Sequence, residues 1–159
     1  MIPLKLLSPK LWQQQAGVLF WCLRKVPMLF WMTPLVKKLT ESECHLYVPL
    51  TWRTRNHLQS MYFGALLSAA DLVCGLVALA ALEKKGVRAR LLFSKVQGQF
   101  LRRPESGVDF HCKISSEALS KLDALQGVGD KAFIVLKVDA LCEGVKVSEF
   151  ELEVALKRL

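Results

Sequence analysis

The sequence predicts an α+β domain in which an antiparallel β-sheet wraps around one long buried helix. Two observations lead to this prediction. Residues 62–85 form an almost wholly apolar segment without proline, and a helix that is apolar on every face has to be surrounded by other elements. Most of the chain after this segment has the residue types and alternation of strands. One sheet curled around one helix satisfies that order of elements.

The composition predicts a single domain with a large core. The chain has 159 residues, of which 52% are hydrophobic and 23% are charged. This length is sufficient for one well-buried core and short for two. The formal charge of +8 suits phosphorylated ligands, anionic lipid headgroups and nucleic acids. Because Lys and Arg are spread along the chain and no nucleic-acid-binding motif occurs, we expect no nucleic-acid partner.

The cysteines and histidines predict neither disulfides nor a metal site. The five cysteines lie far apart without a CxxC pair, and the three histidines lack a spacing that would bring two of them to one metal. We expect the cysteines to be small buried side chains of a protein in a reducing compartment, namely the cytoplasm.

Two apolar segments require a test as membrane spans. Residues 16–36 are interrupted by Arg24, Lys25 and two prolines and lack a cleavage pattern, so they predict neither a span nor a signal peptide. Residues 63–82 are long enough, but Asp71 lies near their middle, where a carboxylate in lipid costs about 3 kcal/mol or more. We interpret the second segment as the core helix of a soluble protein.

Residues 1–40 are predicted to be an N-terminal helical extension, with the main domain at residues 41–159. The extension carries three of the four tryptophans, and Ser8-Pro9 is typical of a helix start. Two later prolines are expected to end or kink the helix. We favour a helix pair packed on the domain or on a dimer mate, and the alternative is peripheral contact with a membrane surface.

The predicted elements of the main domain begin with a strand at residues 44–50, a loop at 51–60 and the long helix at 62–85, which ends at Gly86. The remaining elements are four strands and one short helix. The strands lie at residues 87–102, 108–114, 131–142 and 145–156, and the helix lies at 115–127. A bulge is predicted at Gly98 in the first of these strands, and a Glu143-Gly144 hairpin joins the last two.

Asp71 is the most informative single residue, because it lies within an otherwise apolar helix. An ionised carboxylate in a core is costly unless it is paired, hydrogen-bonded or used in chemistry. Composition alone leaves open whether Asp71 is a structural or a catalytic acid.

The segment before Asp71 has a recognisable spacing. Asn56 lies six residues before Tyr62, Gly64 begins a small-apolar helix, and Asp71 follows Tyr62 by nine residues. This spacing resembles the signature of the phenylacetyl-CoA thioesterase branch of the hotdog-fold proteins, in which Asn precedes a His-Gly-Gly turn and an acid follows it. The stretch Trp52–His57 is still more similar to a less characterised, thioesterase-like bacterial hotdog family. The resemblance covers roughly residues 44–159.

The resemblance implies a hotdog fold and a thioesterase that hydrolyses a fatty or aromatic acyl-CoA without a cofactor. It also implies a homodimer or a dimer of dimers. In this interpretation the backbone N–H groups of Phe63 and Gly64 bind the thioester carbonyl at the positive end of the helix dipole. Asp71 acts as general base or nucleophile, and Asn56 orients water or the carbonyl from across the dimer interface.

The sequence departs from the family pattern at Tyr62 and Phe63, which occupy the positions of the His and the first Gly. A Phe side chain there narrows the approach to the helix, so the alternative is a hotdog protein that binds acyl-CoA or fatty acyl chains without hydrolysis. Tyr62 is either a substitute for the imidazole or an aromatic anchor.

The remaining candidates for substrate binding surround this segment. We expect His57 to be an exposed loop residue rather than a general acid. Arginines suit the phosphates of coenzyme A. The predicted substrate-binding residues are Arg53, Arg55, His57, Ser60, Met61, Tyr62, Phe63 and Ser68, with further arginines at 88, 90, 102 and 103. The alternative, which we expect for most of the arginines, is a solvated residue at the end of a strand.

Overall fold

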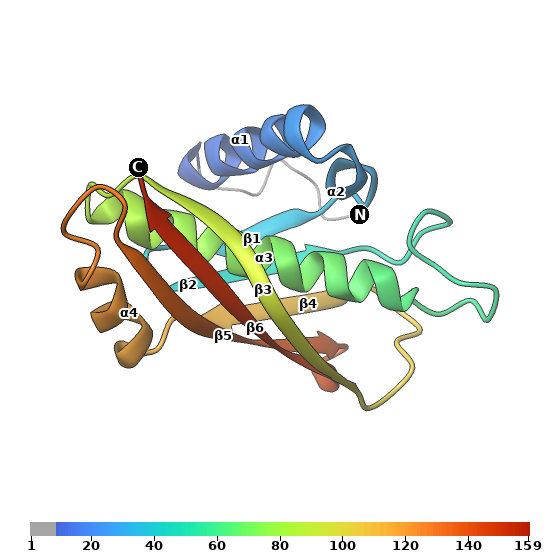
Figure 1. The fold of residues 1–159 in the computed structure, drawn as a ribbon. Coiled ribbons are helices and arrows are strands. Elements are labelled where there is room, and N and C mark those ends of the chain that lie inside the picture. Colours follow the sequence, from blue (N-terminus) through green and yellow to red (C-terminus); the bar gives the residue numbers. More distant parts are fainter. Residues whose placement is uncertain (1–8) are drawn as a thin grey trace.

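The computed structural model describes residues 9–159 (Figure 1). Four helices and six strands follow one another along this part of the chain. They are α1 (Pro9–Lys25), α2 (Pro27–Trp31), β1 (Leu35–Leu39), β2 (Glu43–Val48), α3 (Phe63–Lys84), β3 (Ala89–Phe100), β4 (Val108–Lys113), α4 (Ser116–Asp123), β5 (Lys131–Cys142) and β6 (Val145–Arg158). The predicted cap Ser8 lies outside the described residues, and Pro9 begins α1 as predicted.

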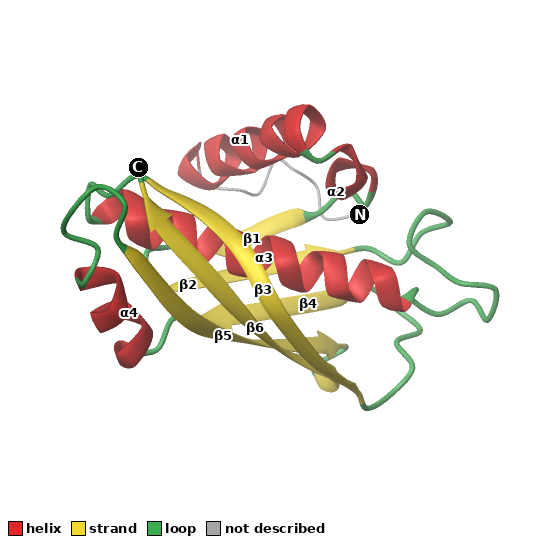
Figure 2. Cartoon of the chain, in the orientation of Figure 1, coloured by secondary structure: helices red, strands yellow, loops and turns green. Residues whose placement is uncertain are grey.

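The six strands form one antiparallel sheet in the order β1-β2-β4-β5-β6-β3. This order leaves β1 and β3 as the edge strands. The sheet curves around α3, and α1 and α2 lie beside β1 on the same side as α3 (Figure 2). The predicted α+β arrangement, one sheet around one long helix, is confirmed.

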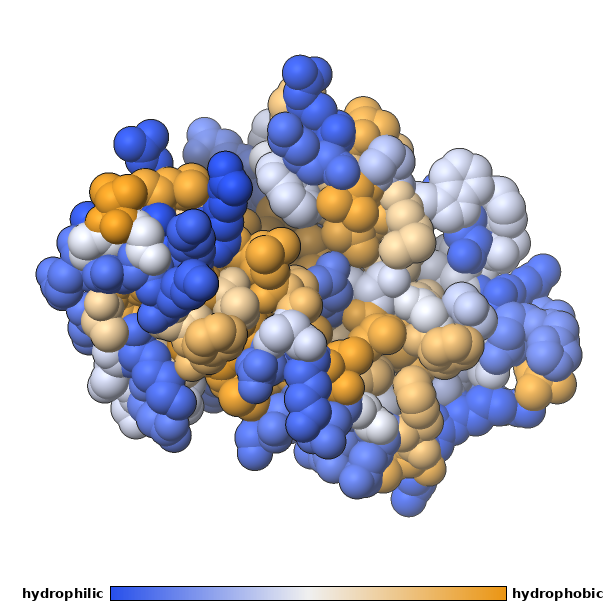
Figure 3. Space-filling view, in the orientation of Figure 1, coloured by the Kyte–Doolittle hydropathy of each residue, from blue (hydrophilic) through white to orange (hydrophobic). Residues whose placement is uncertain are grey.

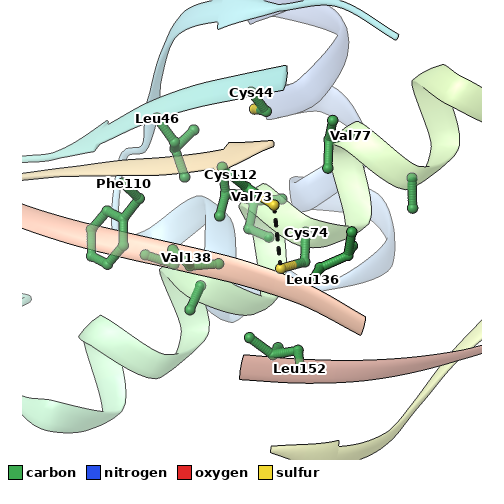
Figure 4. Packing of buried hydrophobic residues seen from close by; sticks show 14 of the residues in the cluster. Cys44, Leu46, Val73, Cys74, Val77, Phe110, Cys112, Leu136, Val138 and Leu152 are labelled. Carbon is green, nitrogen blue, oxygen red and sulfur yellow. Dashed lines mark hydrogen bonds between the residues drawn. The ribbon is translucent and has the colours of Figure 1, made fainter. Parts of the chain in front are cut away.

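Helix α3 forms the centre of the core. Its buried side chains, among them Leu66, Val73 and Val77, pack against the inward faces of the strands (Figure 4). Cys74 Sγ on α3 lies 3.9 Å from Cys112 Sγ on β4. Within residues 9–159, α3 is the one helix that is long and apolar enough to cross a membrane, and 61% of its apolar window is buried inside the protein.

The prediction that residues 44–50 hold the first strand is wrong, because β1 precedes β2 and pairs with it. The N-terminal segment therefore contributes a strand as well as helices. The strand was missed because only Val36 of β1 is buried and two exposed lysines follow it, which leaves too short an alternation.

A buried glutamine of α1 holds the edge of β1. Gln15 is 1% exposed; its Nε2 donates to the Pro34 carbonyl at 2.9 Å, and its Oε1 accepts from the Val36 N–H at 2.6 Å. These two hydrogen bonds satisfy backbone groups at the edge of β1 that would otherwise pair with a neighbouring strand. Helix α1 is thereby fastened to the sheet.

The later elements agree with the sequence prediction except at Gly98. Glu143 and Gly144 have φ values of 51° and 80°, as a tight hairpin between β5 and β6 requires. The bulge of β3 lies between Phe93 and Lys95, whereas Gly98 pairs regularly with Phe150. A Cβ at Gly98 would lie 2.6 Å from the Phe150 ring, so glycine is needed for a close side-chain approach and not for a bulge.

Candidate active site

The loop between β2 and α3 is fixed by internal hydrogen bonds. Thr54 is fully buried; its hydroxyl donates to the Pro49 carbonyl at 2.7 Å, and its carbonyl accepts from the Tyr62 N–H at 2.8 Å. The Met61 N–H donates to the Pro104 carbonyl at 2.9 Å. The loop therefore places Tyr62 directly before α3, at the end of the fold where this loop projects (Figure 1).

The N-terminus of α3 has two free donors. Tyr62 precedes the helix in an extended conformation without a side-chain cap, and its carbonyl accepts from the N–H groups of Ala65 and Leu66. The N–H groups of Phe63 and Gly64 have no acceptor within residues 9–159. Free N–H groups at the positive end of a helix dipole attract a negatively charged oxygen. The two N–H groups of the predicted oxyanion site are therefore unpaired within the described residues.

Aromatic rings surround these donors. The ring of Tyr62 folds over Gly64 so closely that a Cβ at Gly64 would overlap it. The Phe63 ring lies 4.8 Å from that of Tyr62 and 6.3 Å from that of Phe100, between centroids. All three rings are about half exposed. Glycine at position 64 is thus required by the position of the Tyr62 ring.

Asp71 lies about two turns further along α3 and lines an apolar cavity of about 490 Å³. Its carboxylate has no hydrogen bond or ion pair within residues 9–159. Burial raises the pKa of the Asp71 carboxyl above its ordinary value of 3.8. An unpaired acid beside an apolar cavity is typical of a group used in chemistry.

The raised pKa of Asp71 predicts a pH dependence of stability. Between 3.8 and the raised pKa, the folded chain binds more protons than the unfolded chain, so the free energy of unfolding falls as pH rises through this interval. Asp71→Asn removes the contribution. We expect urea unfolding from about pH 4 upward to show the wild type losing stability relative to Asp71→Asn. Parallel pH profiles of the two proteins would contradict the raised pKa.

Most predicted site residues line a second cavity, of about 570 Å³, at the N-terminus of α3. Its predicted members are Asn56, His57, Ser60, Met61, Tyr62 and Phe63. The Asn56 side chain is engaged within its own loop: its Oδ1 accepts from the Leu58 N–H at 2.8 Å, and its Nδ2 lies 3.1 Å from the Ser60 hydroxyl. His57 is exposed, as predicted.

Asp71 and Asn56 line different cavities, and one protomer does not bring them together. Asp71 lies seven positions after Gly64 on α3, a rise of about 10 Å. Ser68 lies between them on the same helix face and is half-buried.

The arginines divide into two groups. Arg53 stacks its guanidinium on Trp31 and Trp52, at 4.6 and 5.3 Å from the ring centroids. Arg55 forms an isolated bridge with Met61 through the backbone. Neither side chain lines either cavity, whereas Arg102 and Arg103 line the cavity of Asn56. Within residues 9–159, no group of His, Cys, Asp and Glu side chains is placed to hold a metal ion.

Most walls of the Asp71 cavity lie outside every predicted site. Its lining comes from α1, α2, α3 and β3 and includes residues of the N-terminal segment, which no site prediction covered. The available signal was a pair of glycines within apolar helices. The lining residues are Gly17, Val18, Trp21, Val26, Leu29, Asp71, Leu72, Gly75, Leu76, Leu79, Leu91 and Phe93.

Comparisons with known proteins agree with this fold. Residues 16–155 match the family described as a domain of unknown function, DUF4442. A comparison with curated proteins gave no match. Among solved structures, similar ones include a proposed thioesterase from Shewanella oneidensis (TM-score 0.79, 17% identity, covering 90% of this chain and 96% of that chain).

Two further similar structures bear the same kind of name. One is a protein of unknown function from Pseudomonas aeruginosa, described as a probable thioesterase (TM-score 0.77, 20% identity, 91% of this chain and 95% of that chain). The other is a thioesterase from Haemophilus influenzae (TM-score 0.67, 14% identity, 86% and 87%). These likenesses confirm the predicted hotdog fold.

Proposed function

The chain belongs to the DUF4442 family, a thioesterase-like family of unknown function, and we propose that it hydrolyses acyl thioesters of coenzyme A. The observation that carries the proposal is Asp71, an unpaired carboxylate beside an apolar cavity of about 490 Å³ on the same helix whose N-terminus has two free N–H groups. The thioesterase names of similar structures support the same reaction class.

The chemistry requires three groups around one carbonyl. The N–H groups of Phe63 and Gly64 donate to the thioester oxygen and stabilise the negative charge that develops there. Asp71 accepts a proton from water while the water oxygen attacks the carbonyl carbon. The carbon–sulfur bond then breaks, and the thiolate of coenzyme A leaves and takes up a proton. In a second version Asp71 attacks the carbon itself, and water hydrolyses the resulting anhydride.

The rise of about 10 Å from Gly64 to Asp71 is too long for both to act on one carbonyl, because reacting groups must approach to about 3–3.5 Å. We propose that a second protomer removes this difficulty by placing its helix N-terminus opposite Asp71 of the first. Strand β3 is the surface for this contact. It is a sheet edge, and its residues Leu92, Val96 and Phe100 are 69%, 46% and 55% exposed.

The dimer predicts a concentration-dependent effect of Val96→Asp. Two carboxylates facing each other across a symmetric β3 contact would raise the dissociation constant of the dimer by more than about tenfold. Sedimentation velocity over a range of concentrations measures it. The control is Val128→Asp, the same substitution at a loop position that is 84% exposed. A fully active monomer would contradict the shared site.

Gly64→Ala tests the oxyanion site. The new Cβ overlaps the Tyr62 ring, so the ring has to leave its place over the helix N-terminus. We expect kcat/KM to fall about tenfold, because small displacements of the groups around a reacting carbonyl are costly. The melting temperature should change little, since alanine favours a helix. Tyr62→Ala should lower kcat/KM similarly, and the double variant should add nothing. Additive losses would show that the ring has a separate role.

The direct test is thiol release from a panel of coenzyme A esters with short, medium, long and aromatic acyl groups. Release of the thiol from at least one class supports the proposal. The absence of release from every ester, with a folded dimeric protein, contradicts it.

A second candidate is an acyl-binding protein without hydrolysis. The exposed Phe63 ring at the helix N-terminus and the internal bonding of the Asn56 amide favour it. Calorimetry with a long-chain acyl-CoA separates the two functions, because binding without thiol release supports this candidate.

Peripheral membrane contact is a further candidate property. Helices α1 and α2 expose apolar side chains beside Arg24 and Lys25, namely Trp12, Phe20, Trp21, Leu23, Met28 and Trp31. Co-flotation with anionic vesicles, which is lost at high salt, would support membrane contact.

A further inference from the structure

The cavity beside Asp71 is walled by the N-terminal helices as well as by α3. Gly17, Val18 and Trp21 of α1 face it from one side, and Leu91 and Phe93 of β3 close another. Figure 3 shows apolar side chains gathered in the hollow between α1 and β3. Among the described residues that line the cavity, Asp71 is the one ionisable group.

Two glycines keep this cavity open. Gly17 lies within α1 and Gly75 within α3, and neither has a positive φ. Gly17 is exposed and Gly75 half-buried, and outside its own helix backbone and chain neighbours a Cβ at either position would meet no heavy atom within 4 Å. Glycine inside a helix destabilises it by about 0.5–1 kcal/mol relative to alanine, so a structural need is expected. Neither a turn nor a close contact explains Gly17 and Gly75, whereas a close approach of an aromatic ring explains Gly64 and Gly98. What the two glycines provide is empty space.

The shape and chemistry of this space select its occupant. The lining of α3 runs from Asp71 to Leu79, a rise of about 12 Å, with Asp71 at one end. Beyond Asp71 the lining offers apolar side chains and glycines. A polar carbonyl group therefore fits best at the Asp71 end, and a hydrocarbon chain fits beyond it.

We propose that this cavity holds the acyl chain of the substrate and that Gly17 and Gly75 set the length of chain accepted. This inference rests on the proposed function, because it takes Asp71 as the group that acts on the thioester. It makes α1 a wall of the substrate site and assigns medium-length or long acyl groups as the substrate class.

The test introduces a larger side chain into the cavity, either from α3 or from α1. In Gly75→Leu and Gly17→Leu, we expect the ratio of kcat/KM for long-chain to short-chain acyl-CoA to fall by more than about tenfold, since a few methylenes decide such discrimination. The melting temperature should not fall, because leucine favours a helix and fills empty space. Ala16→Leu, an exposed position of α1 outside the cavity lining, is the matched control and should keep the wild-type ratio.

A binding measurement is independent of hydrolysis. In an Asp71→Asn background, a coenzyme A ester of a fatty acid brominated in mid-chain should quench the fluorescence of Trp21, which lines the cavity. Loss of the quenching in the Trp21→Phe variant would assign the quenched fluorescence to Trp21. Gly75→Leu should also abolish the quenching.

The outcomes separate this inference from the proposed function. Hydrolysis with an unchanged chain-length ratio and no quenching of Trp21 overturns the inference and leaves the function standing. Quenching without hydrolysis of any ester supports the acyl site and rejects the thioesterase. If Gly75→Leu changes the sedimentation of the protein and not the chain-length ratio, a second copy of the chain fills the cavity, and the inference is wrong.

Discussion

Asp71→Asn is expected to lower kcat/KM for acyl-CoA hydrolysis by about 10²–10⁴-fold, the range that a positioned general base contributes. Asparagine keeps the size and hydrogen-bonding capacity of the side chain and removes its basicity. The fold should survive, because Asp71 forms no hydrogen bond or ion pair within residues 9–159. The asparagine protein should be no less stable near neutral pH, because burial disfavours the carboxylate there.

The measurement is thiol release at saturating and limiting ester concentrations, with melting temperatures of both proteins. Asp123→Asn is the matched control, since Asp123 is exposed on α4 and pairs with Lys85. Because Asp71 must be ionised to act, kcat/KM of the wild type should fall as pH drops through its raised pKa. Full activity of Asp71→Asn with an unchanged pH profile would reject the assignment.

A single-turnover experiment in isotopically labelled water distinguishes the two roles of Asp71. If Asp71 is the nucleophile, water attacks the anhydride, and label can enter the Asp71 carboxyl group. If Asp71 is the base, all label enters the released fatty acid. Mass spectrometry of the peptide that contains Asp71 reads the difference directly.

Short sequence patterns predicted the elements that depend mainly on residues close to one another in the chain. Helix α3 was predicted because it is apolar and uninterrupted up to Gly86, and the β5–β6 hairpin because Glu143-Gly144 suits a tight turn. Strand β1 was missed because its own alternation is too short, and its support comes from pairing with β2 and from Gln15 on α1. Gly98 was wrongly predicted to form a bulge, because the Phe150 ring that leaves no room for a Cβ at this position lies on another strand.

The candidate site also combines features that the sequence shows with features that only the fold creates. The spacing of Asn56, Gly64 and Asp71 is visible in the sequence, and the structure places Asn56 in the loop before α3, Gly64 at the start of this helix and Asp71 further along it. The cavity beside Asp71 is not visible in the sequence, because Gly17 and Gly75 line one space only when α1, packed on α2 and β1, lies across that space from α3. A glycine within an apolar helix is the signal that would have directed attention to them.

Gln15→Leu is expected to lower the free energy of unfolding by about 3 kcal/mol, because it leaves two buried backbone groups without partners and each costs about 1–3 kcal/mol. These groups are the Pro34 carbonyl and the Val36 N–H at the edge of β1. Leucine has a similar volume, so the loss reports the hydrogen bonds and not a cavity. Urea unfolding followed by circular dichroism measures it.

Gln13→Leu is the matched control for Gln15→Leu, since Gln13 lies on the exposed side of the same helix and the substitution is identical. Its effect should stay within about 0.5 kcal/mol. Equal effects of the two substitutions would mean that α1 contributes nothing to the cooperative unit and would support a boundary near residue 40. A large difference makes α1 part of the domain, because one buried side chain then couples the helix, the sheet edge and the wall of the Asp71 cavity.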